Sequence, residues 1–83
     1  MKYRLYAKEP IPLKVPEGHV MSGTLCDFES QAPINRGDKI SLDTNDERLN
    51  NLNVQEVEVV QNPRHIIKEG QITFSVLTVK KID

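Results

Sequence analysis

The chain is poor in the residues that build chemical sites. Its 83 residues include one cysteine, two histidines and no tryptophan, and the four glycines stand apart from one another. A lone thiol cannot form an internal disulfide, and a metal centre needs three or four ligands at defined spacing. A phosphate-binding loop needs several glycines before a helix. We therefore expect no cofactor and no resident metal.

Long apolar runs and an excess of charge are also missing. No stretch has the length of a signal peptide or a membrane span. The chain carries 11 basic and 12 acidic residues, a net charge of −1, with six basic and five acidic groups among the first 41 residues. Phosphate neutralisation requires clustered cations, so this balance disfavours a dedicated nucleic-acid binder. We expect a cytoplasmic protein that does not contact membranes.

β-Branched residues dominate what is present. Valine, isoleucine and threonine together number 19, against two alanines, a composition that favours strands over helices. A chain of this length can bury one thin core. Residues 1–83 are therefore predicted to form a single small β-barrel-like domain.

Alternation of apolar and polar residues marks the strands. Tyr3, Leu5 and Ala7 share one face of a strand over residues 2–7. Further strands are predicted over residues 19–28, 38–43 and 52–60, with a short apolar step at Ile66 and Ile67. The last strand, residues 72–82, has no charge through Val79 and should be central, because such a strand on an edge invites aggregation.

Three features predict a curled sheet. Pro12 lacks a backbone donor, which places residues 11–15 on an edge or in a covering arm. Gly23 indicates a bend or bulge. Apolar residues change parity between Val54 and Val57, which predicts a bulge near Gln55.

These features predict an all-β fold, a small curled barrel or half-open sandwich of five to six short strands. An SH3-like barrel is the first expectation and an OB-like barrel the second. The Gly37-Asp38 turn, followed by a strand, a polar loop and a valine-rich strand, is typical of many small barrels of bacteria, phages and mobile elements.

Catalysis has little support in the sequence. Cys26 with His19 or His65 is the only candidate for a nucleophile and base, and nothing in the spacing brings them together. Glu56 and Glu58 lie on one strand face, where solvated carboxylates are the ordinary interpretation. We expect no enzyme, with a small Cys/His-dependent enzyme or enzyme subunit as the remote alternative.

A non-catalytic module that docks on another macromolecule, most plausibly an unidentified protein, is therefore the main functional prediction. Loops 29–37 and 44–51 are the expected contact surface, since loops on a rigid scaffold carry recognition. Tyr3, Tyr6 and Arg36 are the expected anchors because Tyr and Arg are enriched at binding hot spots. An exposed edge strand could also pair with a partner strand or with a second copy of the chain.

Nucleic-acid binding is the alternative function. Lys2 and Arg4 share a face of the first strand, and Lys80 and Lys81 end the last strand. If the terminal strands pair, these cations are expected to form a compact basic patch with Tyr6 beside it. Edge-strand lysines that prevent sheet-to-sheet pairing are the plainer interpretation.

Overall fold

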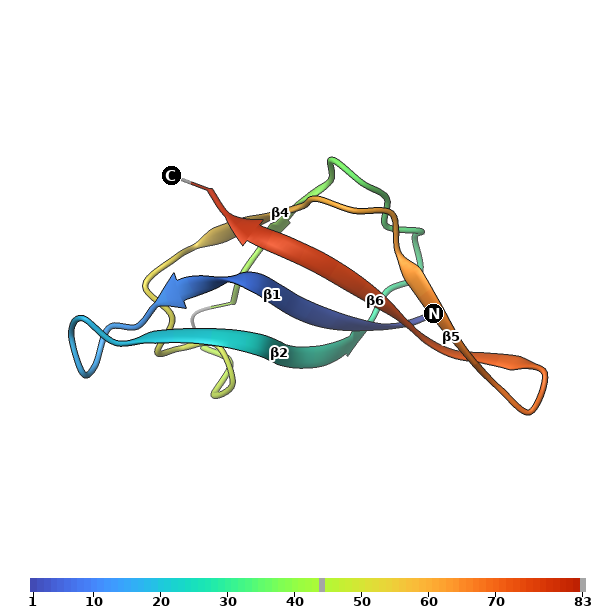
Figure 1. Ribbon diagram of the computed structural model, residues 1–83, viewed down its shortest axis with the longest axis horizontal. Helices are drawn as coiled ribbons and strands as arrows, with labels where there is room; N and C mark the ends of the chain where they lie inside the picture. The colour runs from blue at the N-terminus through green and yellow to red at the C-terminus, as the bar shows by residue number, and fades with distance from the viewer. Residues whose placement is uncertain (44, 83) are drawn as a thin grey trace.

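The computed structural model describes residues 1–43 and 45–82 (Figure 1). Within them the chain is all-β, as predicted, and forms six strands joined by turns and loops. In chain order the strands are β1 (Lys2–Pro12), β2 (Val20–Glu29), β3 (Lys39–Ser41), β4 (Glu56–Val59), β5 (Arg64–Lys68) and β6 (Gln71–Lys81). The described residues contain no helix of the length and apolar character needed to cross a bilayer.

The strands form one sheet in the order β2-β1-β6-β4-β3, with β5 paired to β6 as well. The terminal strands β1 and β6 pair with each other and run parallel, from Tyr3 opposite Ser75 to Ala7 opposite Val79. The opposite edge of β6 pairs first with β5 and then with β4. The uncharged last strand is therefore central, as predicted.

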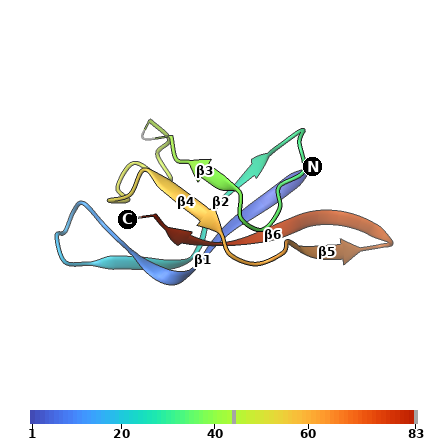
Figure 2. The ribbon, with the colours of Figure 1, turned by 90° about the horizontal axis from the view of Figure 1, so that it is seen from above.

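The sheet is curled and does not close into a barrel. Figure 2 shows β3 and β4 above β1 in the view, with the β5–β6 hairpin reaching away at one end. The molecule measures 43 × 22 × 21 Å, so it is elongated along this hairpin. Of the two architectures predicted, the half-open sandwich is the one that forms.

The apolar core lies inside the curled sheet. The alternation predicted for the first strand is confirmed, because Tyr3, Leu5 and Ala7 are all buried. Alternate residues of β4 and β6 face the same interior, and three leucines of the connecting segments complete it. The fully buried members from β4 and β6 are Val57, Val59, Leu77 and Val79, and the leucines are Leu42, Leu49 and Leu52.

β1 is irregular where it leaves β6. Its pairing with β2 shifts between Leu5 and Tyr6 and again between Ala7 and Ile11. Gly23 lies opposite Ala7 at the second shift with a φ of 90°, a conformation that glycine adopts without strain. Pro12 ends the strand, beyond the last β1–β6 pair and paired only with β2. The bend at Gly23 and the edge position of Pro12 are both as predicted.

The strand predicted over residues 52–60 is shorter than expected. Only Glu56–Val59 is a strand, and Leu52 forms a single bridge with Leu13. The change in parity marks the end of a loop rather than a bulge within a strand, because residues 52–55 turn to cover the core. The polar stretch before it contains a hydrogen-bonded turn in which the Leu49 and Asn50 amides donate to the Asp46 carbonyl. Residue 44, part of the predicted contact loop, lies outside the described residues.

Candidate functional site

The predicted basic patch is not compact. In the parallel register Arg4 lies opposite Val76, and Lys80 lies four residues farther along β6. At about 3.3 Å per residue this separates the two basic groups by ~13 Å along the strands. Lys2 and Arg4 would lie opposite Lys80 and Lys81 only if the terminal strands ran antiparallel. The expectation of one compact patch is therefore wrong.

Arg4 and Lys80, two of these cations, lie beside acidic partners. Arg4 donates two hydrogen bonds to Asp27, at 2.9 and 3.1 Å, and its guanidinium lies 4.3 Å from the centre of the Phe74 ring. The hydrogen bonds between the two side chains lower the pKa of the Asp27 carboxyl and raise the pKa of the Arg4 guanidinium. The Lys80 amine lies 4.0 Å from a Glu58 carboxylate oxygen. Both pairs weaken the attraction of this face for a polyanion.

The predicted anchors lie in different environments. Tyr3 is only 2% exposed, stacks on Phe28 with ring centres 5.8 Å apart, and accepts a hydrogen bond from the Ile34 amide. It is a core residue and offers no contact surface. Tyr6 is 39% exposed on the outer face of β1, and Arg36 is exposed in the loop between β2 and β3.

The structure gives Cys26 the surroundings of a core residue. It is 8% exposed and packs within the main apolar cluster. Burial raises the pKa of the Cys26 thiol, so the thiol stays protonated and weakly nucleophilic. His65 instead shares a 2.6 Å hydrogen bond with the buried Ser75 hydroxyl. Residues 1–43 and 45–82 contain no cluster of three or more potential metal ligands.

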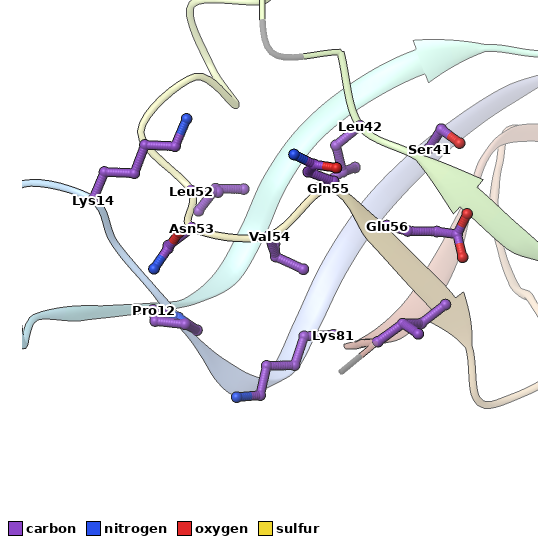
Figure 3. A pocket seen from close by; sticks show the side chains of 11 residues that line it. Pro12, Lys14, Ser41, Leu42, Leu52, Asn53, Val54, Gln55, Glu56 and Lys81 are labelled. Atoms are coloured by element: carbon purple, nitrogen blue, oxygen red, sulfur yellow. The ribbon is translucent and has the colours of Figure 1, made fainter.

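A hollow lies at the open end of the sandwich, where β1 and β6 separate (Figure 3). We call this hollow the open-end groove; its volume is about 860 Å³. Side chains of β1, β3, β4, β6 and the segment 52–55 surround it. They are Pro12, Lys14, Ser41, Leu42, Leu52, Asn53, Val54, Gln55, Glu56, Lys81 and Ile82.

Backbone hydrogen bonds hold the walls of the groove on both sides. The Asn53 amide donates to the Pro12 carbonyl at 2.7 Å, which fastens the segment 52–55 to β1. The Leu42 amide donates to the Gln55 carbonyl at 2.8 Å, which fastens the same segment to the end of β3. On the far side the Ile82 amide donates to the Glu56 carbonyl at 3.2 Å. A groove built this way needs little rearrangement to receive a ligand.

The groove is apolar at its base and polar at its rim. Leu42 and Leu52 are buried, at 8% and 3% exposure, and Val54 is half-buried. The rim carries the side-chain amides of Asn53 and Gln55 and three charged residues. In Figure 3 Lys14 and Glu56 lie on opposite sides of the hollow, and the third charged residue is Lys81. An apolar base with a few polar groups is the usual composition of a binding site.

An arginine side chain, Arg48, links the free edge of β2 to the segment that follows β3. Arg48 donates to both carboxylate oxygens of Asp46, at 3.0 and 2.8 Å, and to the backbone carbonyl of Asp27 at 2.8 Å. The side-chain hydrogen bonds from Arg48 lower the pKa of Asp46 to about 2. Arg48 thus covers part of the free β2 edge, which reduces the space for pairing with a second chain.

The open-end groove was not foreseen from the sequence, although Lys81 was a candidate. Its walls come from segments that are distant in the sequence, from Pro12 to Ile82, and only the proline that ends β1 gave a local signal. No family model matches the chain, and no curated protein or solved structure matches it significantly.

Proposed function

We propose that this chain is a non-catalytic binding module of the cytoplasm that docks on a protein partner through the open-end groove. The groove, with its apolar base and polar rim, is the observation that carries the proposal. The buried, protonated thiol of Cys26 supports a non-catalytic role, because it lacks the lowered pKa of a reactive cysteine.

The proposed occupant is an extended segment of the partner that carries apolar side chains and a carboxylate. A hollow of about 860 Å³ holds several side chains, and the buried Leu42 and Leu52 favour apolar ones. The exposed Lys14 on the rim favours an acidic group on the partner. The β1–β6 register ends at Ala7 and Val79, so the diverging strand ends can flank an extended chain.

A protein partner is favoured over nucleic acid by the distribution of charge. Arg4 and Lys80, two members of the predicted basic patch, are engaged by Asp27 and Glu58. The groove has an apolar base and no exposed aromatic ring on which a base could stack. Nucleic-acid binding remains the competing function, and the experiment below distinguishes the two.

Site-specific photocrosslinking tests the proposal. A photoreactive phenylalanine analogue replaces Asn53, an exposed rim residue, and in a control replaces Glu69, in the turn between β5 and β6. Each protein is irradiated in lysate of its native host with and without nuclease. We expect one nuclease-resistant protein adduct at position 53, none at position 69, and loss of the adduct on Val54→Asp.

Three results would contradict the proposal. The first is the absence of an adduct at position 53, and the second is equal labelling at positions 53 and 69. The third is recovery of nucleic acid together with proteins that disappear after nuclease treatment, which would favour the nucleic-acid alternative. Circular dichroism of the Val54→Asp variant must show the native fold, because Val54 is half-buried.

A further inference from the structure

A second hollow lies on the outer face of the sheet, separate from the open-end groove. We call it the Tyr6 pocket. Its volume is about 380 Å³ and the side chain of Val76 forms part of its lining. The polar residues around it are Tyr6, Lys8, Gln61, Asn62, Arg64 and Thr78.

Strand register brings these residues together from three parts of the chain. Tyr6 lies opposite Thr78 in the β1–β6 pairing, and Arg64 lies opposite Val76 in the β5–β6 pairing. Lys8 follows Tyr6 by two positions along the same strand, the spacing that returns a side chain to the same face. The segment 60–63 crosses from β4 to β5 and is held by a 2.9 Å hydrogen bond from the Val60 amide to the Thr78 carbonyl.

The lining of the Tyr6 pocket is rich in hydrogen-bond donors. Its polar side chains are an ammonium, a guanidinium, two carboxamides, a phenol and a hydroxyl, and no carboxylate is among them. Within residues 1–43 and 45–82, the side chains of Tyr6, Lys8 and Arg64 make no hydrogen bond or ion pair. The nearby cations differ, since Arg4 is paired with Asp27 and Lys80 with Glu58. The pocket therefore gathers two cations whose charge the described protein does not neutralise.

We propose that the Tyr6 pocket binds an oxyanion, a carboxylate or phosphoryl group, carried by a protein partner. The Arg64 guanidinium supplies the planar fork that binds two oxygens at once, and Lys8 supplies a second positive charge. Tyr6 and Val76 contact the apolar part of the residue that bears the anion. This site is independent of the open-end groove and does not require that groove to be occupied.

The size and charge of the pocket favour one anionic group over a polyanion. Two cations around about 380 Å³ match a single carboxylate or phosphoryl group. A nucleic-acid backbone presents successive phosphates and is bound along a track of cations. Here the flanking Arg4 and Lys80 are already paired, so the track is interrupted on both sides.

Nuclear magnetic resonance of the whole chain tests the site. Uniformly labelled protein is titrated with inorganic phosphate, acetate or chloride at constant ionic strength. We expect saturable amide shifts from phosphate or acetate confined to residues 6–8, 61–64 and 76–78, and none from chloride. Shifts that do not saturate, or that spread evenly over the surface, overturn the proposal.

Matched arginine variants identify the group responsible. Arg64→Gln should weaken phosphate or acetate binding by about tenfold or more, because a charge-assisted hydrogen-bond partner is lost. Arg36→Gln removes an exposed arginine outside the pocket and should bind like the unaltered protein. Arg64 is itself exposed, so a native spectrum is expected for both variants. Equal affinity in the two variants rejects the assignment.

Competition identifies the carrier of the anion. A glutamate-rich peptide, with and without one phosphoserine, and an oligothymidylate of equal charge each compete with phosphate. Displacement of phosphate by either peptide at the same residues supports a ligand carried by a protein. The peptide that displaces phosphate at the lower concentration shows whether the pocket prefers a carboxylate or a phosphoryl group. Tighter, Arg64-dependent binding of the oligothymidylate overturns that choice. Val54→Asp should leave these titrations unchanged, so the proposals for the open-end groove and for the Tyr6 pocket are tested independently.

Discussion

Replacing the two tyrosines of β1 separates a core function from a surface function. Tyr3 is 2% exposed, and its hydroxyl accepts the Ile34 amide hydrogen bond at 3.1 Å. Tyr3→Phe keeps the ring and removes only this acceptor from a half-buried amide. A lost hydrogen bond of this kind costs about 1 kcal/mol. For a domain of this size that cost lowers Tm by roughly 4–8 °C.

Removal of the whole Tyr3 side chain should be far more damaging. Tyr3→Ala removes a ring that stacks on Phe28 and leaves a core cavity, at a cost of about 3–5 kcal/mol. Total stability at ~0.05–0.15 kcal/mol per residue amounts to about 4–12 kcal/mol for such a chain. Tyr3→Ala should therefore leave much of the protein unfolded at the lower end of that range. Tyr6 is 39% exposed, and Tyr6→Ala should cost less than about 1 kcal/mol.

Urea denaturation followed by circular dichroism measures all three variants, and amide exchange at Ile34 reports the lost hydrogen bond directly. Tyr3→Phe should keep its crosslink at position 53 and its phosphate binding, whereas Tyr6→Ala should weaken phosphate binding and remain folded. The reasoning is refuted if Tyr3→Phe has unaltered stability and unaltered exchange at Ile34. It is also refuted if Tyr6→Ala destabilises the chain as much as Tyr3→Ala does.

Four further predictions concern the Asp46–Arg48 pair and the buried core. The pKa of Asp46 is lowered from 3.8 to about 2, so the stability that ionised Asp46 contributes is complete above its ordinary pKa and is lost as pH falls from about 4 to 2. Over this pH range the urea midpoint of the unaltered protein should fall more steeply than the urea midpoint of Asp46→Asn. Arg48→Met should increase amide exchange near Asp27, on the β2 edge that Arg48 covers, more than in β6. The buried thiol of Cys26 should react with a disulfide reagent much more slowly in the native protein than in urea, and equal rates would show that it is accessible. Leu77→Ala should cost about 2–5 kcal/mol in the same denaturation assay, since Leu77 is fully buried.

Much of the fold could be predicted because the relevant signals are local. Alternation over Tyr3, Leu5 and Ala7 places these residues in the core, and the lack of charge in β6 places this strand in the centre of the sheet. The length of β4 could not be predicted in the same way. Leu52 and Val54 show strand-like alternation, yet the backbone of segment 52–55 bonds to Pro12 on one side and Leu42 on the other. Tertiary contacts override the local pattern there.

The direction of a strand relative to its partner is not a local property. The alternation of the terminal strands is the same for parallel and antiparallel pairing, so the sequence does not give their direction. The parallel pairing separates Arg4 from Lys80 and brings Tyr6 opposite Thr78. The predicted patch failed for this reason, and for the same reason the Tyr6 pocket could not be anticipated. The sequence also gives no sign that its other cation, Arg64, lies across β6 from β1.

Both candidate sites depend on one irregularity in β1. The strand pairs with β6 only as far as Ala7, and its register with β2 is broken between Ala7 and Ile11. Lys8 lies just beyond the last β1–β6 pair and lines the Tyr6 pocket, and Pro12 lines the open-end groove. If β1 continued in register with β6, residues 8–12 would lie beside Lys80 and the residues that follow it, and the sheet would close over the mouth of the groove. The Gly23 conformation opposite Ala7 supports this break, because a φ of 90° strains any residue with a side chain. Gly23→Val should therefore disturb both sites together, even though Gly23 lines neither of them.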